Sequence, residues 1–344
     1  MIKTIGLGLL AVTAGLIGQA QAQSNIEAFY KGRSIDLIIG GDVGGGYDIY
    51  GRALARHIPR HIPGQPTIVA KNMPGAGSNK AAEFLYGTAA KDGTAFGIIF
   101  PGAIMTPLLE PERGLKFDPP KFQFLGTANK EVRVCAFSSA IPVKTFADAM
   151  KSEVILAASS DGGSTVDYPA VFNDVLGTKF RIVRGYKGTR EITLAVERGE
   201  AQGLCGWAWS SLKTQVPHWL ADKKANIVVQ NGMARDPELD KMGVPPTWDF
   251  VKSDADRQLL DLMIGQQDIG RAFLLPPGVP QPVVAALRAA FDATMKDKEF
   301  LADADKLKID ITTATGQEIQ DLVTKMYATP KPVVDRLIKA MKQP

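Results

Sequence analysis

Residues 35–48 read Ile-Asp-Leu-Ile-Ile-Gly-Gly-Asp-Val-Gly-Gly-Gly-Tyr-Asp, and this stretch decides the fold class. Its apolar, β-branched start has the composition of a buried strand, and the apolar residues that follow Tyr47 fit helical spacing. Glycines join the two, so the stretch predicts a strand, a tight turn and a helix start. The first N–H groups of a helix lack intrahelical partners and lie at the positive end of its dipole. Such a turn therefore favours a bound anion, which glycine allows to approach the backbone closely.

Neither of the glycine motifs that bind nucleotides fits this stretch. A P-loop ends in Gly-Lys-Ser/Thr, whereas Gly46 is followed by Tyr47 and Asp48. The dinucleotide fingerprint needs a third glycine where Ile49 stands, and an acidic residue about 20 positions further on. No Asp or Glu occurs between Asp48 and Glu83. The expected anion is therefore not a nucleotide held by either motif.

The first 22 residues have the pattern of a secretory signal peptide. Lys3 is their only charge, residues 5–17 form a short apolar core, and Ala20-Gln21-Ala22 is an A-x-A cleavage site. The apolar core is too short to span a bilayer. We therefore expect residues 1–22 to be removed, the mature protein to begin near Gln23, and its location to be the periplasm. A buried N-terminal helix is the alternative.

The length and charge of the chain limit its architecture and partners. It has 344 residues, of which 45% are hydrophobic and 22% charged, with a formal net charge of +4. The roughly 320 residues after the signal peptide exceed what one core comfortably supports, so we expect two domains. The slight basicity is dispersed, and aromatic residues do not interleave with Lys and Arg, so no nucleic-acid partner is expected.

An enzyme is the competing class, but the residues that catalysis needs are sparse. The chain has three His residues and no Gly-x-Ser-x-Gly elbow. His57 and His61 lie four apart, yet Pro59 separates them and no third metal ligand supports them. We therefore expect no catalytic residues, no metal and no cofactor. A secreted lyase or isomerase remains the alternative in this class.

Strand-like and helix-like segments alternate along the chain. Strands are expected near 34–40, 67–71, 94–100, 122–127, 131–137, 153–158, 180–185, 226–230 and 269–275. Helices are expected near 47–58, 79–90, 144–152, 165–177, 188–199, 254–264, 281–295, 316–327 and 330–341. Such alternation predicts parallel sheets with helices on both faces, and ligands on such sheets bind where strands lead into helices.

Three loops at strand-to-helix junctions share the same chemistry. They span residues 44–48, 72–79 and 159–165, and each contains glycines that free backbone N–H groups. The second and third add Ser or Thr hydroxyls at positions that cap a helix. One such loop is usually only a tight turn, but three in one chain favour a shared anion-binding cleft.

The two cysteines, Cys135 and Cys205, are both flanked by strand-like residues. In an oxidising compartment a disulfide between them would close a loop of some 70 residues, worth roughly 4 kcal/mol in the chain-entropy model. Two buried free thiols are the alternative, and both remain open because the sequence does not show whether the strands are neighbours.

The order of these motifs resembles the periplasmic substrate-binding proteins of tripartite tricarboxylate transporters, the Bug family. The resemblance covers nearly the whole chain after the signal peptide. It rests on Val43-Gly44-Gly45-Gly46-Tyr47-Asp48, Asn72-Met73-Pro74-Gly75-Ala76-Gly77, Lys91-Asp92-Gly93-Thr94, Gly163-Ser164, Tyr186-Lys187-Gly188 and Leu275-Pro276-Pro277-Gly278-Val279-Pro280.

The resemblance implies an α/β, two-domain periplasmic-binding-protein clamshell of type II. Each domain would be a mainly parallel sheet flanked by helices, with the ligand cleft between domains. The first domain would take residues 24–127 plus 229–344, and the second 128–228. A monomer would capture a small organic acid, either a di- or tricarboxylate or an aromatic acid, and deliver it to the membrane permease subunits of a tripartite transporter. Presentation of the ligand to a sensor or receptor is the alternative.

The resemblance also implies which residues bind the ligand. Backbone N–H groups and hydroxyls would hold the carboxylate rather than an arginine clamp, and no glycine loop presents a bidentate arginine. The expected ligand-binding residues are Gly44, Gly45, Gly46, Tyr47, Asp48, Ala76, Gly77, Ser78, Asn79, Gly102, Ser160, Gly163, Ser164, Thr165, Tyr186 and Trp207. For Trp207 two interpretations stay open: its ring closes over an apolar part of the ligand, or it packs in the hinge.

Overall fold

The computed structural model describes residues 25–159 and 163–342 of the chain. The expected signal peptide and Ser160 lie outside these residues. No helix in the described part is long and apolar enough to cross a membrane.

The chain forms two compact units. Unit 1 comprises Met1–Lys130 and Ile269–Thr324, and unit 2 comprises Glu131–Asp268 and Lys325–Pro344. The chain thus crosses between units after Lys130, after Asp268 and after Thr324. This division differs from the expected boundaries chiefly at 229–268 and 325–344, which lie in unit 2 rather than with the first domain.

Unit 1 is built on a six-stranded mixed sheet. Its order is β11-β4-β10-β3-β1-β2, where β1 pairs in parallel with both β2 and β3, and β10 pairs antiparallel with β3 and β4. The strands are β1 (Ser34–Ile39), β2 (Thr67–Asn72), β3 (Ala95–Ile98), β4 (Gln123–Thr127), β10 (Ala272–Leu275) and β11 (Ala314–Thr315). Because β10 is reversed, it begins at the edge where β1, β2 and β3 end.

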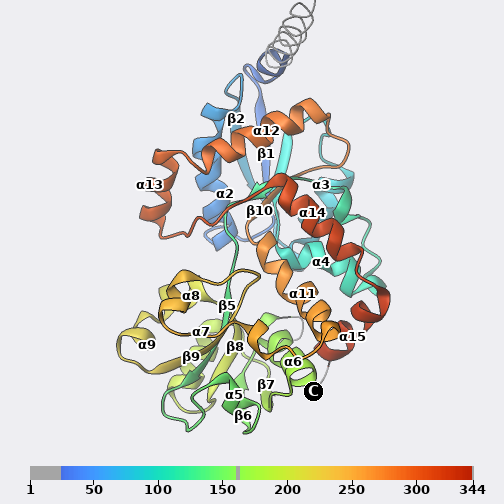
Figure 1. Cartoon of the computed structure of the whole chain (residues 1–344). Coiled ribbons are helices and arrows are strands. Elements are labelled where there is room, and N and C mark those ends of the chain that lie inside the picture. The colour runs from blue at the N-terminus through green and yellow to red at the C-terminus, as the bar shows by residue number, and fades with distance from the viewer. Residues whose placement is uncertain (1–24, 160–162, 343–344) are drawn as a thin grey trace, which may run out of the picture. The chain divides into compact units, whose positions relative to one another are not determined.

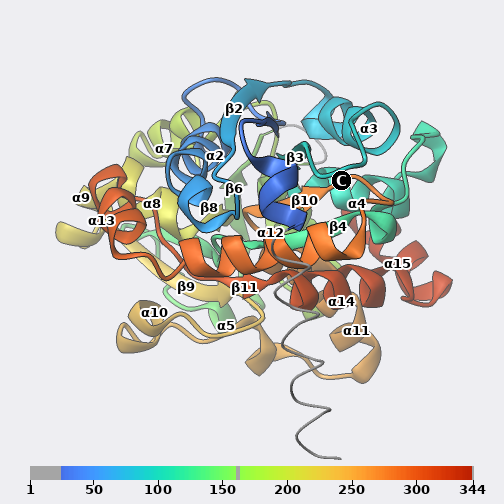
Figure 2. The same ribbon diagram turned by 90° about the horizontal axis from the view of Figure 1, so that it is seen from above.

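Helices cover both faces of the unit 1 sheet. Alternate residues of β1 (Ile35, Leu37 and Ile39) enter a core shared with buried residues of α2 and α12, as expected when side chains alternate across a strand. α12 runs alongside β4 (Figure 2). On the other face α3 lies directly on β3, since a Cβ at Gly97 would meet Leu85 at 2.4 Å. The helices are α2 (Gly46–His57), α3 (Asn79–Gly87), α4 (Pro101–Leu109), α12 (Gln281–Thr294), α13 (Lys298–Leu307) and α14 (Gly316–Tyr327), the last of which continues past Thr324 (Figure 1).

Unit 2 is built on a five-stranded mixed sheet of order β7-β6-β8-β5-β9. β6 is parallel to β7 and β8, whereas β5 is antiparallel to β8 and β9. The strands are β5 (Arg133–Ser138), β6 (Val154–Ala157), β7 (Phe180–Val183), β8 (Gly203–Ala208) and β9 (Ala225–Asn231). The structure joins Cys135 of β5 to Cys205 of β8 in a disulfide, so the bridged alternative is the one observed.

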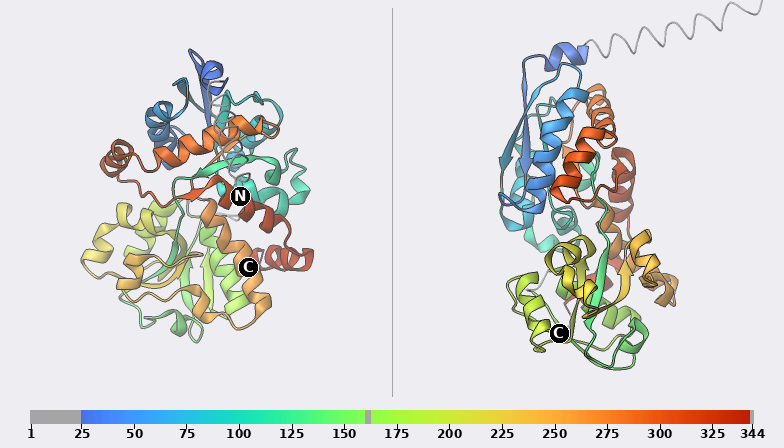
Figure 3. Two further views of the ribbon diagram at one scale, coloured as in Figure 1. Left: turned by 45° about the horizontal axis from the view of Figure 1, so that its top comes forward. Right: turned by 90° about the vertical axis from the view of Figure 1, so that its left-hand side faces the viewer.

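The helices of unit 2 also cover both faces of its sheet. One face carries a core to which β5, β8, α7, α8 and α9 contribute, with Trp207 and Trp219 in edge-to-face contact at 6.1 Å. On the other face the rings of Phe146, Phe172 and Phe180 lie together. α15 lies against α6 (Figures 1 and 3). The helices are α5 (Phe146–Ala149), α6 (Ser164–Leu176), α7 (Thr189–Glu197), α8 (Trp209–Gln215), α9 (Pro217–Ala221), α10 (Pro237–Lys241), α11 (Asp254–Ile269) and α15 (Lys331–Met341).

The expected α/β class and two sheets flanked by helices are confirmed, with a difference in strand direction. Both sheets are mixed, because one strand in the interior of each sheet, β10 or β5, runs against its neighbours. Several elements were not expected from the sequence. They are β8, whose two glycines hide its strand pattern, the Pro- and Gly-containing α4, and the short α8, α9, α10, α13 and β11.

Candidate functional site

The carboxyl ends of β1, β2 and β3 lie at one edge of the unit 1 sheet, because the three strands are parallel. The glycine loop after β1 and the loop after β2 therefore meet there, as does the short connection from β3 to α4. Asn72 links the first two loops: its side-chain N–H group donates to the Gly41 carbonyl at 3.0 Å. The rings of Tyr47 and Phe100 link the first and third, with centroids 4.3 Å apart.

The buried side chain of Asp48 stabilises the glycine loop. Its side chain is buried and accepts hydrogen bonds from the Gly44 N–H at 2.9 Å, from Asn72 at 2.9 Å and from Arg52 at 2.8 Å. Burial raises the pKa of the carboxyl group, but these hydrogen bonds and the nearby guanidinium hold it below its ordinary value. A carboxylate in this position stabilises the turn and, since its oxygens are engaged, is suited to positioning the loop rather than to contacting an anion.

The loop after β2 has an unusual backbone. Ala76, Gly77 and Ser78 all have positive φ angles, of 48°, 63° and 74°. Only glycine adopts this region without cost, and non-glycine residues held there cluster at ligand-binding and catalytic sites. The strain at Ala76 and Ser78 therefore supports a functional role for this loop.

Ser78 connects the three loops through its side chain, which is almost completely buried. Its hydroxyl group donates to the Gly40 carbonyl at 2.8 Å and accepts from the Phe100 N–H at 3.2 Å. A Cβ at Gly40 would lie 2.5 Å from the Ser78 hydroxyl oxygen, so glycine is needed for this approach. The hydroxyl proton is thus engaged inside the protein.

Three helices begin at this edge: α2 at Gly46, α3 at Asn79 and α4 at Pro101, with Gly102 next in α4. The first N–H groups of each helix have no intrahelical acceptor. Asn79 is buried and donates to the Ala76 carbonyl at 2.8 Å, while its Oδ1 atom has no hydrogen-bond partner among the described residues. The Asn79 backbone N–H is bonded to the Ala76 carbonyl and Pro101 has no N–H, so the backbone donors expected at this edge are those at the start of α2 and at Gly102.

Arg271 is a residue of this edge that the sequence analysis missed. It directly precedes the reversed strand β10, so it lies where the parallel strands end. One guanidinium nitrogen is 3.5 Å from the position of a Cβ on Gly46, and the guanidinium carbon is 4.1 Å from the ring centroid of Tyr47. The Tyr47 hydroxyl group donates to the Gly270 carbonyl at 3.1 Å. A positive charge therefore lies beside the α2 N-terminus.

The third expected loop lies in unit 2, where β6 leads into α6. Gly163 is the N-cap of α6, followed by Ser164 and Thr165. The Thr165 side chain is buried, and its hydroxyl group bonds to the Ser159 N–H at 3.0 Å and the Ser159 hydroxyl at 2.9 Å. Thr165 thus holds the end of β6 against the helix, whereas Ser164 is partly exposed.

Arg133 also escaped the sequence analysis. It opens β5, and because β5 runs against β8, its first residue lies at the edge where β6 and β8 end. One guanidinium nitrogen donates to the Ser164 hydroxyl oxygen at 2.9 Å and to the Gly206 carbonyl at 2.8 Å. Its Nε donates to the Gln267 side-chain oxygen at 2.8 Å.

Tyr186 and Trp207 differ in how they are placed. Tyr186 is partly exposed beside the end of β6, where its N–H donates to the Ala158 carbonyl at 3.3 Å. Trp207 is only 2% exposed and packs on Trp219 in the unit 2 core. Of the two interpretations left open for Trp207, packing is the one that its burial supports, and it occurs within unit 2.

No group of three or more His, Cys, Asp or Glu residues suited to a metal ion occurs in the described part of the chain. His57 and His61 instead contact carboxylates of the α13 region, Asp303 at 2.9 Å and Asp297 at 2.7 Å.

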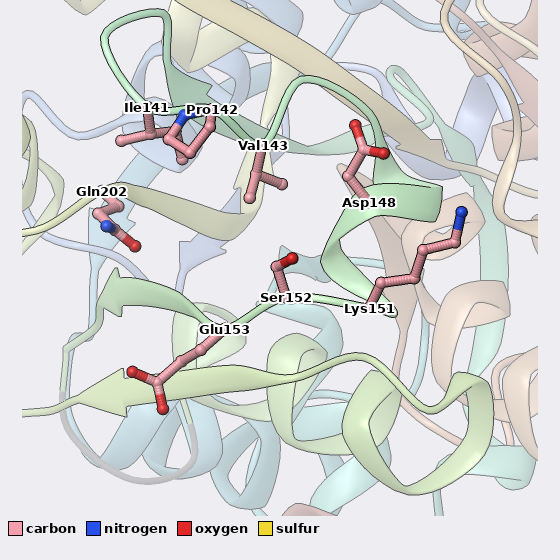
Figure 4. Close-up of a pocket in the computed structure, with 8 residues that line it drawn as sticks. All are labelled: Ile141, Pro142, Val143, Asp148, Lys151, Ser152, Glu153 and Gln202. Carbon is pink, nitrogen blue, oxygen red and sulfur yellow. The ribbon is translucent and has the colours of Figure 1, made fainter.

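A pocket of about 240 Å³ lies in unit 2, near the amino ends of β6 and β8, at the edge opposite to the candidate loops (Figure 4). Its polar groups are partly engaged: the Asp148 carboxylate accepts from the Lys144 and Thr145 N–H groups, and the Gln202 side chain accepts from the Ile155 N–H. It contains none of the expected ligand-binding residues.

Comparisons with known proteins identify the fold. No protein-family model and no curated protein matches the chain. Solved structures do: a TctC solute-binding protein from Polaromonas is 18% identical, covers 89% of this chain and 99% of its own, and has a TM-score of 0.68. The R. palustris protein Rpa4515 with adipate is 18% identical over 89% of this chain and 97% of its own, with a TM-score of 0.61.

MatC from Rhodopseudomonas palustris with bound malate is 19% identical, covers 88% of this chain and 99% of its own, and has a TM-score of 0.59. Identities this low speak for the fold alone. The chain therefore has the fold of the TctC and Bug periplasmic solute-binding proteins.

Proposed function

We propose that this protein is an extracytoplasmic solute-binding protein that captures a small organic carboxylate and delivers it to a membrane permease. The observation that carries the proposal is the edge of unit 1, where three helix N-termini, a strained loop and the Arg271 guanidinium come together. Backbone N–H groups and a guanidinium are the donors that a carboxylate prefers.

The ligands of structurally similar proteins agree with this chemistry. One is described with malate and another with adipate, both of them dicarboxylates. In our proposal the ligand of this chain is likewise a di- or tricarboxylate or an aromatic acid. One carboxylate is held at the unit 1 edge, and the start of α6 at Ser164 carries donors of the same kind in unit 2.

The expected residues divide into two roles in this proposal. Gly46, Tyr47 and Gly102 supply the N–H groups of the helix starts in unit 1, and Ser164 and Tyr186 supply donors in unit 2. Asn79, whose backbone N–H is bonded to the Ala76 carbonyl, supports the loop after β2 instead. The remaining expected residues, apart from Ser160, which lies outside the described residues, hold these donors in place. They are Gly44, Gly45, Asp48, Ala76, Gly77, Ser78, Gly163, Thr165 and Trp207.

The affinity that this arrangement supports is in the micromolar range. A hydrogen bond to a charged group contributes about 1.5–3 kcal/mol. A few such bonds, reduced by the cost of association, give about −8 kcal/mol, which corresponds to a Kd near 1 μM.

Calorimetric titration and thermal unfolding with malate, adipate, citrate and benzoate test the proposal, with succinamide as an uncharged control. At a ligand concentration 100 times the Kd, the stabilisation is about 2.7 kcal/mol. At about 2–4 °C per kcal/mol, Tm should rise by roughly 5–11 °C. The proposal fails if none of the four acids gives heat or raises Tm. N-terminal sequencing of protein from the periplasm tests export, with cleavage expected after Ala22.

A sensor or receptor would use the same carboxylate site and remains the second candidate. Transport requires that loss of the protein abolishes uptake of the bound acid. If uptake is unchanged in a strain without the protein while a transcriptional response to the acid is lost, the sensor function replaces delivery to a permease.

A further inference from the structure

The two cysteines of the chain lie on neighbouring strands in the interior of the unit 2 sheet. Cys135 belongs to β5 and Cys205 to β8, and a disulfide joins them. Each of these strands is paired on both sides, β5 with β8 and β9, and β8 with β5 and β6. Both cysteines are 0% exposed, so the bridge lies inside the folded unit and not at its surface.

Helix α6 belongs to the layer that covers the bridge. Val134 and Ala136, on either side of Cys135, are both part of the core that α7, α8 and α9 share with the sheet. Because side chains alternate along a strand, Cys135 points to the opposite face. On that face α6 lies against β8 and contributes the buried ring of Phe172. A reagent can therefore reach the sulfur atoms only if this layer opens.

The backbone on both sides of Cys205 is packed too closely to admit even a methyl group. A Cβ at Gly203 would lie 2.5 Å from the Ala136 carbonyl oxygen, on the neighbouring strand β5. A Cβ at Gly206 would lie 2.1 Å from the Ser164 carbonyl oxygen, in the first turn of α6. β8 is thus held tightly against both β5 and α6, so it has to separate from them before another molecule can approach its cysteine.

Thiol–disulfide exchange needs direct access to a sulfur atom. In oxidation, one cysteine thiolate attacks the disulfide of an oxidant, which forms a mixed disulfide and releases one oxidant thiol. The second cysteine thiolate attacks the protein sulfur of the mixed disulfide, so the protein disulfide forms and the second oxidant thiol leaves. The oxidant thereby takes up two electrons and two protons. Because the mixed disulfide attaches the oxidant directly to a cysteine, it does not fit where both cysteines are completely buried.

The order of elements along the chain leaves a stage of folding at which the bridge can form. Residues 136–204 separate the two cysteines, and they contain β6, β7, α5, α6 and α7. The covering helix α6 thus lies within the loop that the bridge closes. The connectivity therefore allows β5 and β8 to meet before α6 packs on them, and in that open form both thiols are accessible.

We propose that the Cys135–Cys205 bond is made by an external disulfide oxidant while unit 2 is still open, and that folding then closes it to redox exchange. The bond is a permanent part of the folded protein and not a redox switch. Reduction and oxidation follow the same path in opposite directions, so the folded protein has to open for either. The inference goes beyond the proposed function and holds whichever ligand the protein binds.

Reduction of the bridge by excess dithiothreitol tests the proposal, with free thiols counted by mass spectrometry after alkylation with iodoacetamide. In native buffer, reduction should be about 1,000-fold slower than in concentrated urea, because opening the interior strands costs a large part of the free energy of unfolding. As urea is added, the rate should rise in step with the loss of the circular-dichroism signal. Ser152→Cys is the control, because it places a thiol at an exposed position of the same unit, which should be alkylated rapidly in native buffer.

Cys135→Ala separates access to the sulfur from the chemical stability of the bond. The variant has no disulfide, so alkylation of its remaining thiol at Cys205 is irreversible and depends only on access and on thiol reactivity. In native buffer this thiol should be alkylated about 100-fold more slowly than in urea. We expect a smaller factor than for reduction of the bridge, because loss of the bridge makes the folded unit easier to open.

The possible results are distinct. Slow reduction that follows unfolding, together with rapid alkylation in Ser152→Cys, supports the proposal. Reduction in native buffer within about tenfold of the rate in urea overturns it, because the bridge would then exchange in the folded protein. Alkylation of Cys205 in folded Cys135→Ala as fast as in urea overturns it as well. If circular dichroism shows that Cys135→Ala does not fold, the reduction rates of the unchanged protein decide alone.

Discussion

Replacing Ser78 with alanine should destabilise the protein more than it weakens ligand binding. The substitution removes the hydrogen bond to the buried Gly40 carbonyl at 2.8 Å and the one from the Phe100 N–H at 3.2 Å. A buried group left without a partner costs about 1–3 kcal/mol, and a second, less buried one about 1 kcal/mol. We therefore expect a loss of about 2–4 kcal/mol in the free energy of unfolding, which lowers Tm by roughly 4–16 °C.

Thermal and urea unfolding followed by circular dichroism measure this effect. On the same samples, Kd is measured for whichever of malate, adipate, citrate and benzoate the unchanged protein binds most tightly. Ser152→Ala, at an exposed position of unit 2, is the matched control and should leave Tm unchanged. Ser78→Gly should be less destabilising than Ser78→Ala by about 1 kcal/mol, because glycine adopts the φ of 74° without strain. An unchanged Tm together with a tenfold weaker Kd in Ser78→Ala would refute the reasoning, because Ser78 would then contact the ligand directly.

Three more predictions concern the charge, the backbone and the disulfide of the two units. Burial raises the pKa of Asp48, but the hydrogen bonds that its carboxylate accepts outweigh burial and hold the pKa below its ordinary value. The carboxylate therefore stabilises the folded protein at a pH above its unfolded pKa, and this stabilisation is lost as the pH falls through its folded pKa. Asp48→Asn should therefore lower Tm at pH 7 and make the loss of Tm below about pH 4 shallower, and an unaltered pH profile of Tm would contradict this. Gly206→Ala should lower Tm strongly or prevent folding, because its Cβ would lie 2.1 Å from the Ser164 carbonyl oxygen at a positive φ, and a Tm within 2 °C of the unchanged protein would be evidence against it. Replacing Cys135 and Cys205 together by alanine should cost roughly 4 kcal/mol, since the disulfide spans a sequence separation of 70 residues; denaturant unfolding measures this, and equal stability with and without the bridge would contradict the chain-entropy estimate.

The fold was accessible from the sequence because its strands and helices have clear hydrophobic periods. The run at 35–39 is apolar and buried except for Asp36, and its glycine turn leads into α2 as expected. β8 was not among the expected strands because Gly203 and Gly206 interrupt its pattern, and its place is set by pairing with β5 and β6 rather than by local propensity.

The candidate site was only partly predictable. The glycine loops are recognisable from the local sequence, and two of them meet at one edge of unit 1. Arg133 and Arg271 are isolated in the sequence, far from the loops that they contact in space, and no local signal marks them. What brings them there is strand direction: each stands at the start of a reversed strand, and a reversed strand begins where its parallel neighbours end. Burial likewise separated the roles of Ser78 and Ser164, which motif spacing alone does not distinguish.

The reversed strands β5 and β10 have a consequence for the length of the short segments that precede them. Neighbouring residues of a strand point to opposite faces, so if a residue added between Lys130 and Arg133 shifted the pairing of β5 by one position, the arginine would turn to the other side of the sheet. The same holds for an insertion between Asp268 and Arg271. The length of these two connectors therefore matters for the direction in which each arginine points. A linker in this protein would be lengthened more safely at another position.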